Sequence, residues 1–300
     1  MNLKTLQAMM ALAIAVPAGA WAASPVIGTA MTNGSFRVDQ ATVRGNATLF
    51  EGSVLETAAA SSAVQLSNGT RLELSADSRG RLYGDRLVLE KGQGELAESN
   101  QYRLEALGLQ VEPVNSASRG RISVGGNQVL VAALDGSFRI RNAAGQIVAN
   151  VPAGATLSFE PQAGAANSTK LTGCLENQDG HYVLTDEVTN LTVELGGPGL
   201  SPEAGNRVEV TGAMDPTATP VKQASQYIQV SQVRQLNKGC GNGGAIAAAA
   251  GAGGAAAGGG ILGLSGTTVA VIGGVAAAAA VGGLAAADAL PGQSRGTVSR

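Results

Sequence analysis

The chain has 300 residues, of which 14% are charged, and its formal net charge is −2. A protein that binds nucleic acid by neutralising phosphates needs a basic surface, so this balance excludes a nucleic-acid partner of that kind. The length allows about two domains of ordinary size.

The amino-terminal residues 1–22 predict a secretory signal peptide. Lys4 supplies a positive start, residues 6–15 are apolar, and Ala20-Trp21-Ala22 is a cleavage site of small-residue type. The alternative is an uncleaved membrane anchor, for which the apolar stretch is short. We therefore expect export to the periplasm.

Residues 24–161 predict a domain made of antiparallel strands. Val64 to Leu66 and Leu72 to Leu74 alternate in polarity around Asn68-Gly69, a pair suited to a type I′ turn. Similar short apolar runs recur at intervals of about ten residues with turn signals between them. The pattern favours a sandwich, a jelly roll or a β-solenoid.

Residues 46–161 resemble the FecR domain, the periplasmic sensing part of ferric-citrate-type sigma regulators. The resemblance rests on ATLFEGSVLETAAASSAVQLSNGTRLELSADSRGRL from Ala47, LVLEKGQGEL from Leu87, and VLVAALDGSFRIRNAAGQIVANVPAGATLSFEP from Val129. It implies a FecR-like β fold and a periplasmic location. Full regulators carry a cytoplasmic sigma-binding segment and a membrane helix ahead of this domain, whereas here a signal peptide stands in that place. The resemblance therefore does not imply sigma control.

Arginine outnumbers lysine in this predicted domain. Arg71, Arg79, Arg81 and Arg86 lie on or beside expected strands. Guanidinium groups bind carboxylates and phosphates in a forked geometry, so these residues form a candidate surface for an anionic partner. The alternative is that they keep the sheet soluble and protect its edges.

Residues 168–240 predict a small five-stranded Greek-key barrel of the OB type. Asp179-Gly180 marks its first turn, and Gly196-Gly197-Pro198-Gly199 marks a later loop. The expected strands cover residues 171–175, 181–185, 191–195, 207–211 and 227–233.

The two cysteines, Cys174 and Cys240, lie at the start and the end of this expected barrel. In an oxidising compartment we expect them to form a disulfide. A zinc site needs four ligands, and two cysteines with His181 fall short of that number. We therefore expect no metal site.

The carboxy-terminal part contains no charged residue between Gly239 and Ala287. Residues 241–260 predict a Gly/Ala-rich linker, and residues 261–287 are long enough to cross a hydrocarbon core of about 30 Å as a helix. Small residues recur there at every fourth position, which suits helix pairing and homo-oligomers in a membrane. They are Gly266, Ala270, Gly274, Ala278, Gly282 and Ala286. The tail 288–300, with Arg295 and Arg300, fits a cytoplasmic end.

Residues equipped for catalysis are scarce in this sequence. His181 follows a turn signal, and Asp186-Glu187 is an adjacent pair whose side chains on a strand end would face different directions. The run GAGGAAAGGG lacks the Lys-Ser/Thr of a phosphate-binding loop. We therefore expect no catalytic residues and no cofactor.

Together these features predict a non-enzymatic envelope protein that presents β surfaces for binding or scaffolding. Its expected partner is another envelope protein or a polysaccharide, and its expected location is the periplasm, anchored in the inner membrane by residues 261–287. Without insertion of that segment the protein would be soluble in the periplasm. The alternative is a FecR-type sensor of an iron or envelope signal that lacks its own sigma-binding segment, and an enzyme with an unfamiliar site at His181 is a third hypothesis.

Overall fold

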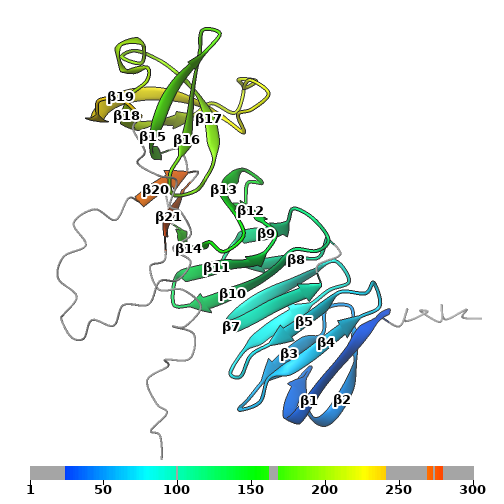
Figure 1. The fold of residues 1–300 in the computed structure, drawn as a ribbon. Helices are drawn as coiled ribbons and strands as arrows, with labels where there is room; N and C mark the ends of the chain where they lie inside the picture. The colour runs from blue at the N-terminus through cyan, green and yellow to red at the C-terminus, as the bar shows by residue number, and fades with distance from the viewer. Residues whose placement is uncertain (1–23, 99–100, 162–167, 241–268, 273, 280–300) are drawn as a thin grey trace, which may run out of the picture.

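The computed structural model describes residues 24–98, 101–161, 168–240, 269–272 and 274–279 (Figure 1). These residues form strands, turns and one short 3-10 helix, η1 (Ser201–Glu203), with no α-helix among them. The prediction of an all-β fold is therefore confirmed. The signal peptide 1–22, the linker 241–260 and the tail 288–300 lie outside the described residues.

The first fourteen strands build one layered unit, which we call the roll. In chain order they are β1 (Val26–Val38), β2 (Ala41–Phe50), β3 (Val54–Thr57), β4 (Ser62–Leu66), β5 (Arg71–Leu74), β6 (Arg79–Leu82), β7 (Arg86–Glu98), β8 (Arg103–Ala106), β9 (Leu109–Pro113), β10 (Arg119–Gly125), β11 (Gln128–Asp135), β12 (Phe138–Arg141), β13 (Ile147–Val151) and β14 (Thr156–Pro161).

The roll consists of two facing sheets that share their long strands. Sheet one runs β1-β4-β5-β7-β10-β11-β14. Sheet two runs β1-β3-β6-β7-β8-β9-β12-β13. Strands β1 and β7 have 13 residues each and bend from one sheet into the other. In β7 the bend falls at Gly92, whose φ of 84° is accessible to glycine at little cost.

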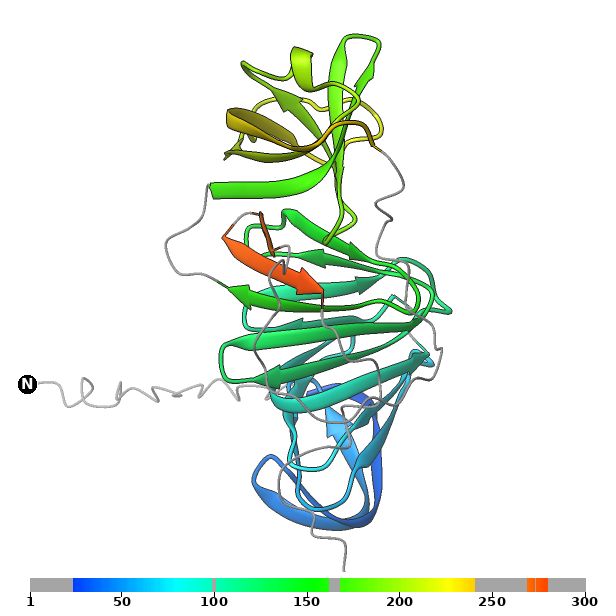
Figure 2. The ribbon, with the colours of Figure 1, turned by 60° about the vertical axis from the view of Figure 1, so that its left-hand side comes forward.

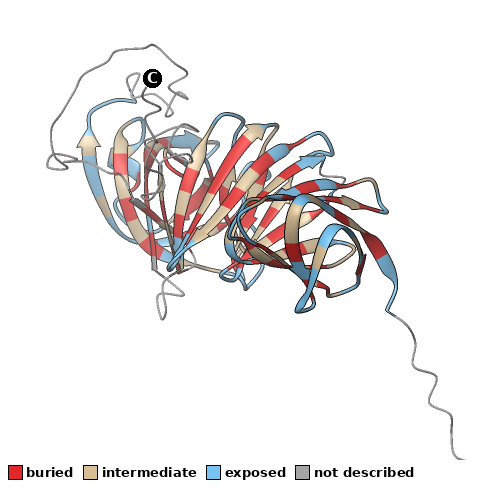
Figure 3. Ribbon diagram, turned by 90° about the horizontal axis from the view of Figure 1, so that it is seen from below, coloured by how far each residue is buried: buried red, intermediate tan, exposed pale blue. Residues whose placement is uncertain are grey.

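Alternating burial along these strands places one side of each sheet in a common core (Figure 3). Phe36, Phe138 and Phe159 are at most 1% exposed and lie among buried leucines and valines from both sheets. The polar residues between them face solvent, as a half-buried strand requires.

The Asn68-Gly69 hairpin forms, but the predicted turn type is wrong. Gly69 donates its N–H to the Leu66 carbonyl and has a φ of 89°, whereas Asn68 is not among the residues with positive φ. A type I′ turn requires positive φ at both central residues. The loop is instead a turn followed by a left-handed glycine, and the Asn68 side chain accepts the Thr70 N–H at 2.9 Å.

Five further strands close into a small barrel, as the sequence predicted. They are β15 (Ser168–Gln178), β16 (His181–Asp186), β17 (Thr192–Gly196), β18 (Arg207–Met214) and β19 (Tyr227–Asn237). The ring runs β15-β16-β17-β19-β18 and back to β15, with β17 and β19 parallel. This is the strand order of a five-stranded OB-type barrel, and Figures 1 and 2 show it at one end of the roll.

The predicted helix over 261–287 is wrong at the residues that the structure describes. Strands β20 (Val269–Ile272) and β21 (Val275–Ala279) form an antiparallel hairpin. Strand β21 pairs with β14 from Val275 to Ala279, and Val271 of β20 pairs with Lys170 of β15. Of the small-residue stripe, Ala270 and Ala278 lie on the two strands and Gly274 lies in the turn between them, so these three described members do not line one helical face.

Two physical causes favour strands at this position. Val269, Val271, Ile272 and Val275 are β-branched and flank a glycine turn. The edge of β14 also offers unpaired backbone groups, and the hairpin buries Ala270, Ile272, Val275 and Ala277 against the core. Among the described residues no helix is long and apolar enough to cross a membrane.

A cysteine pair across β14 and β21 tests this hairpin. Ser158 and Ala278 are register partners, so Ser158→Cys with Ala278→Cys should form an intrachain disulfide in the folded protein. The measurement is a count of free thiols after unfolding without reductant. Ser158→Cys with Ala279→Cys is the matched control, because neighbouring residues on a strand face opposite sides. Free thiols in both variants would contradict the hairpin.

Candidate functional site

The predicted arginine surface is only partly assembled in the fold. Arg79 and Arg81 on β6 and Arg86 on β7 share the solvent face of sheet two, as their alternation with buried residues shows. Arg71 lies on β5, in sheet one. The structure therefore separates Arg71 from the other three.

Most of these guanidinium groups are already bound to carboxylates of the same chain. Arg79 contacts Glu90 at 2.6 Å and Glu56 at 2.9 Å, and the hydrogen bonds to these two raise the pKa of Arg79. Arg71 contacts Glu98 at 3.1 Å.

Arg86 contacts Asp85 at 3.0 Å and lies over the Tyr83 ring at 4.1 Å. Arg81 donates to the Gly52 carbonyl at 3.4 Å and has no carboxylate partner among the described residues. On the solvent face of sheet two, most arginines are therefore paired with carboxylates of the same chain. Binding of an anionic partner by this face stays a prediction.

The barrel and the roll meet through backbone and amide hydrogen bonds. Asn150 on β13 donates its N–H to the Thr189 carbonyl at 2.7 Å and its side-chain amide to the Asn190 carbonyl at 3.2 Å. Gln226 donates its side-chain amide to the Ile147 carbonyl. The turn between β16 and β17 therefore covers the edge of β13. No feature of the sequence indicated this contact.

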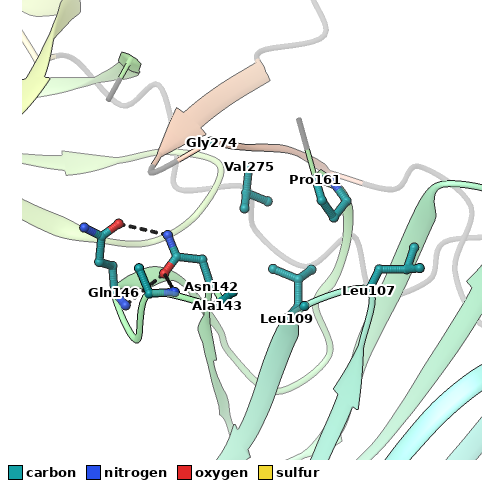
Figure 4. A pocket seen from close by; sticks show the side chains of 10 residues that line it. Leu107, Leu109, Asn142, Ala143, Gln146, Pro161, Gly274 and Val275 are labelled. Atoms are coloured by element: carbon teal, nitrogen blue, oxygen red, sulfur yellow. Dashed lines mark hydrogen bonds between the residues drawn. The ribbon is translucent and has the colours of Figure 1, made fainter. Parts of the chain in front are cut away.

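A cavity of about 370 Å³ opens where the carboxy-terminal hairpin crosses the roll (Figure 4). Leu107, Leu109, Pro161 and Val275 give it apolar walls. Two amides, of Asn142 and Gln146, line another part and are joined by a hydrogen bond of 2.8 Å. None of its lining residues carries a group for acid–base chemistry at neutral pH.

The carboxylates that sequence reasoning singled out have structural partners. Asp186 is 1% exposed and accepts hydrogen bonds from the N–H groups of Thr172, Val188 and Thr189 and from the Thr189 hydroxyl, at 2.8 to 3.2 Å. Burial raises the pKa of Asp186, and these hydrogen bonds oppose the rise. Glu187 points elsewhere and binds Arg207 at 2.6 and 2.7 Å.

His181 lies at the start of β16, and its Nδ1 is 2.7 Å from a carboxylate oxygen of Glu194. The other Glu194 oxygen accepts the Val221 N–H at 2.8 Å. Glu194 therefore holds the loop between β18 and β19 against β17. No group of three or more His, Cys, Asp or Glu residues that could hold a metal occurs among the described residues.

The predicted disulfide is present. Cys174 on β15 is bonded to Cys240, with Cα atoms 5.6 Å apart and 66 residues of sequence separation. The bond ties the first barrel strand to the chain just beyond the last one.

No family model matches the chain, and no curated protein matches it. Among solved structures, a candidate anti-sigma factor from Parabacteroides distasonis is similar at 11% identity with a TM-score of 0.30. The match covers 36% of this chain and 54% of that one, so this chain spans about half of its length. The resemblance to the FecR domain therefore stays a prediction, and we draw no functional conclusion from this likeness.

Removal of the disulfide should destabilise the barrel. Cys174→Ser with Cys240→Ser opens a loop with a separation of 66 residues. On the entropic account, loss of a cross-link of this span costs about 4 kcal/mol in the free energy of unfolding. Urea unfolding followed by circular dichroism measures the loss. An unchanged midpoint would show that other contacts hold the barrel ends together.

Loss of the Asp186 carboxylate should also destabilise the barrel. Asp186→Ala leaves three buried N–H groups without an acceptor, which costs about 3 kcal/mol or more in the free energy of unfolding. The control is Asp215→Ala, which removes a similar turn contact to Thr217 at a site open to water. Equal losses in the two variants would contradict a special role for burial.

Proposed function

We propose that this chain is an exported, non-enzymatic envelope protein that works in the periplasm as a β scaffold. It would hold another envelope protein, or a polysaccharide, on the solvent faces of the roll and the barrel. The observation that carries this proposal is the fixed junction between the two units, made by Asn150, Gln226 and the β20–β21 hairpin.

The junction supports a scaffolding role for a physical reason. Two β units joined only by a short segment would reorient freely, and a bound partner would bear the entropic cost of ordering them. Here the barrel covers the edge of β13, and the hairpin pairs with strands of both units. A partner that spans both surfaces therefore binds two units whose relative orientation is already fixed.

The chemistry of the charged residues supports binding rather than turnover. Arg79 and Arg86 of sheet two bind neighbouring carboxylates, and Asp186 and Glu194 are engaged with backbone N–H groups. Catalysis needs an acid, base or nucleophile aimed at a substrate site. The cavity at the hairpin has no such group in its lining.

The proposed location follows from the leader and the hairpin. The predicted signal peptide and the disulfide are consistent with an oxidising compartment outside the cytoplasm. Because residues 269–272 and 275–279 pair with protein strands, we propose the soluble periplasmic form rather than the inner-membrane anchor.

Cross-linking in intact cells, followed by capture of the tagged full chain, tests this function. We expect envelope proteins or polysaccharide in the captured material. Gln226→Ala removes the hydrogen bond to the Ile147 carbonyl and should reduce capture, because it loosens the junction. Gln232→Ala, at an exposed position on β19 that makes no junction contact, is the matched control and should lower capture less than Gln226→Ala does.

Two results would overturn the proposal. Recovery of a sigma factor would identify the chain as a regulator of the FecR type. A turnover abolished by His181→Ala at an unchanged melting temperature would identify it as an enzyme.

A further inference from the structure

The edge strands of the roll are covered at one end of the molecule and free at the other. At the barrel end, the edge of β13 is covered by the barrel turn, and the edge of β14 is paired with β21. At the opposite end, β2 pairs with β1 alone among the described residues (Figures 1 and 2). Apart from the groups of Phe50, the ten-residue strand β2 therefore leaves its outer row of backbone groups to solvent.

Strand β2 carries few of the features that usually protect an exposed edge, although its pairing with β1 has register shifts between Met31 and Ser35 and between Val26 and Gly28. Natural edge strands are commonly short, carry several charges or contain proline. Here Arg44 is the single charged residue in ATVRGNATLF, and there is no proline. Phe50 is 41% exposed, and its cross-strand partner Val26 is 56% exposed.

The free part of this edge has a defined end and a defined bend. The N–H and the C=O of Phe50 are both bonded to Ser53, which leaves residues 41–49 for pairing. Gly45, with a φ of 82°, lies at the centre of that run. The half before Gly45 follows the sheet-two end of β1, and the half after it follows the sheet-one end.

A second copy of the chain satisfies this geometry. A partner strand must bend at the position opposite Gly45, and an antiparallel copy does so when a twofold axis passes through that residue. Symmetric contacts of this kind are the commonest way in which identical chains associate. The residues that face the core, Val43, Ala47 and Leu49, would then continue the interior of one roll into the other.

The side chains of β2 are compatible with this twofold register. With the axis at Gly45, Arg44 of one copy lies opposite Asn46 of the other, and Thr42 lies opposite Thr48. On the inner side Val43 meets Ala47, and Ala41 meets Leu49. No like charges oppose each other, and paired threonines are favourable cross-strand neighbours.

We propose that two copies of this protein pair antiparallel along β2, about a twofold axis at Gly45. Sheet one of each copy then continues into sheet two of the other. This inference does not depend on the proposed scaffolding function.

A charge-sign experiment on the full chain tests the pairing. Asn46→Glu places a carboxylate opposite Arg44 at two symmetric positions, and Asn46→Lys places an ammonium there. The dissociation constant of the dimer, from sedimentation equilibrium, should fall for the first variant and rise for the second. Each change should be roughly 2- to 30-fold, from the range for cross-strand charge pairs. Adding Arg44→Glu to Asn46→Lys should restore the affinity.

The control variants are Ala63→Glu and Ala63→Lys, at an exposed position of β4 that carries the same charge changes away from the edge. They should leave the dissociation constant unchanged, and the melting temperature checks that every variant is folded. A chain that is monomeric at all concentrations would overturn the proposal, and would leave the edge to an extended segment of another protein. A dimer whose affinity ignores the sign of the charge at position 46 would also overturn it.

Discussion

The constraint on which the structure depends is the pairing of backbone groups at sheet edges. Every strand offers N–H and C=O groups on both sides, and a terminal strand leaves one row unpaired. In the roll, the long bent strands β1 and β7 reduce the number of unpaired rows. Each pairs with strands of both sheets, so the ladder of hydrogen bonds continues from one sheet into the other. The remaining edges at the barrel end are covered by Thr189 and by β21.

This arrangement decides how the charged residues are used. On the outer face of sheet two, register brings Glu56 beside Arg79 and Glu105 near Arg86. Exposed ion pairs of this kind add little stability individually, yet they neutralise a face that would otherwise attract anions non-specifically. The surface is therefore polar, nearly balanced in charge and fixed in shape by the sheet beneath it.

Alternating polarity in short runs predicts the all-β class and the five strands of the barrel, which are present as β15 to β19. The barrel closes through the parallel pairing of β17 with β19, two strands that are not neighbours along the chain. The length and the lack of charge of residues 261–287 predict a membrane helix, but a segment rich in alanine and glycine is compatible with several structures. Val271, Ile272 and Val275 around a glycine turn were the signal for strands. The Asn150–Thr189 contact and the arginine ion pairs depend on register between distant segments, which no local pattern encodes.

The position of β21 fixes the order in which the molecule can be completed. Leu157 pairs with Ala279, so the strand that finishes sheet one comes from far along the chain, after the whole barrel has been made. Contacts between such distant segments form slowly, because the chain between them must first be brought together. During synthesis the roll would therefore wait with β14 uncovered until the last segment arrives. A prematurely terminated chain would keep the edge of β14 unpaired, and such a chain would be a target for chaperones and proteases.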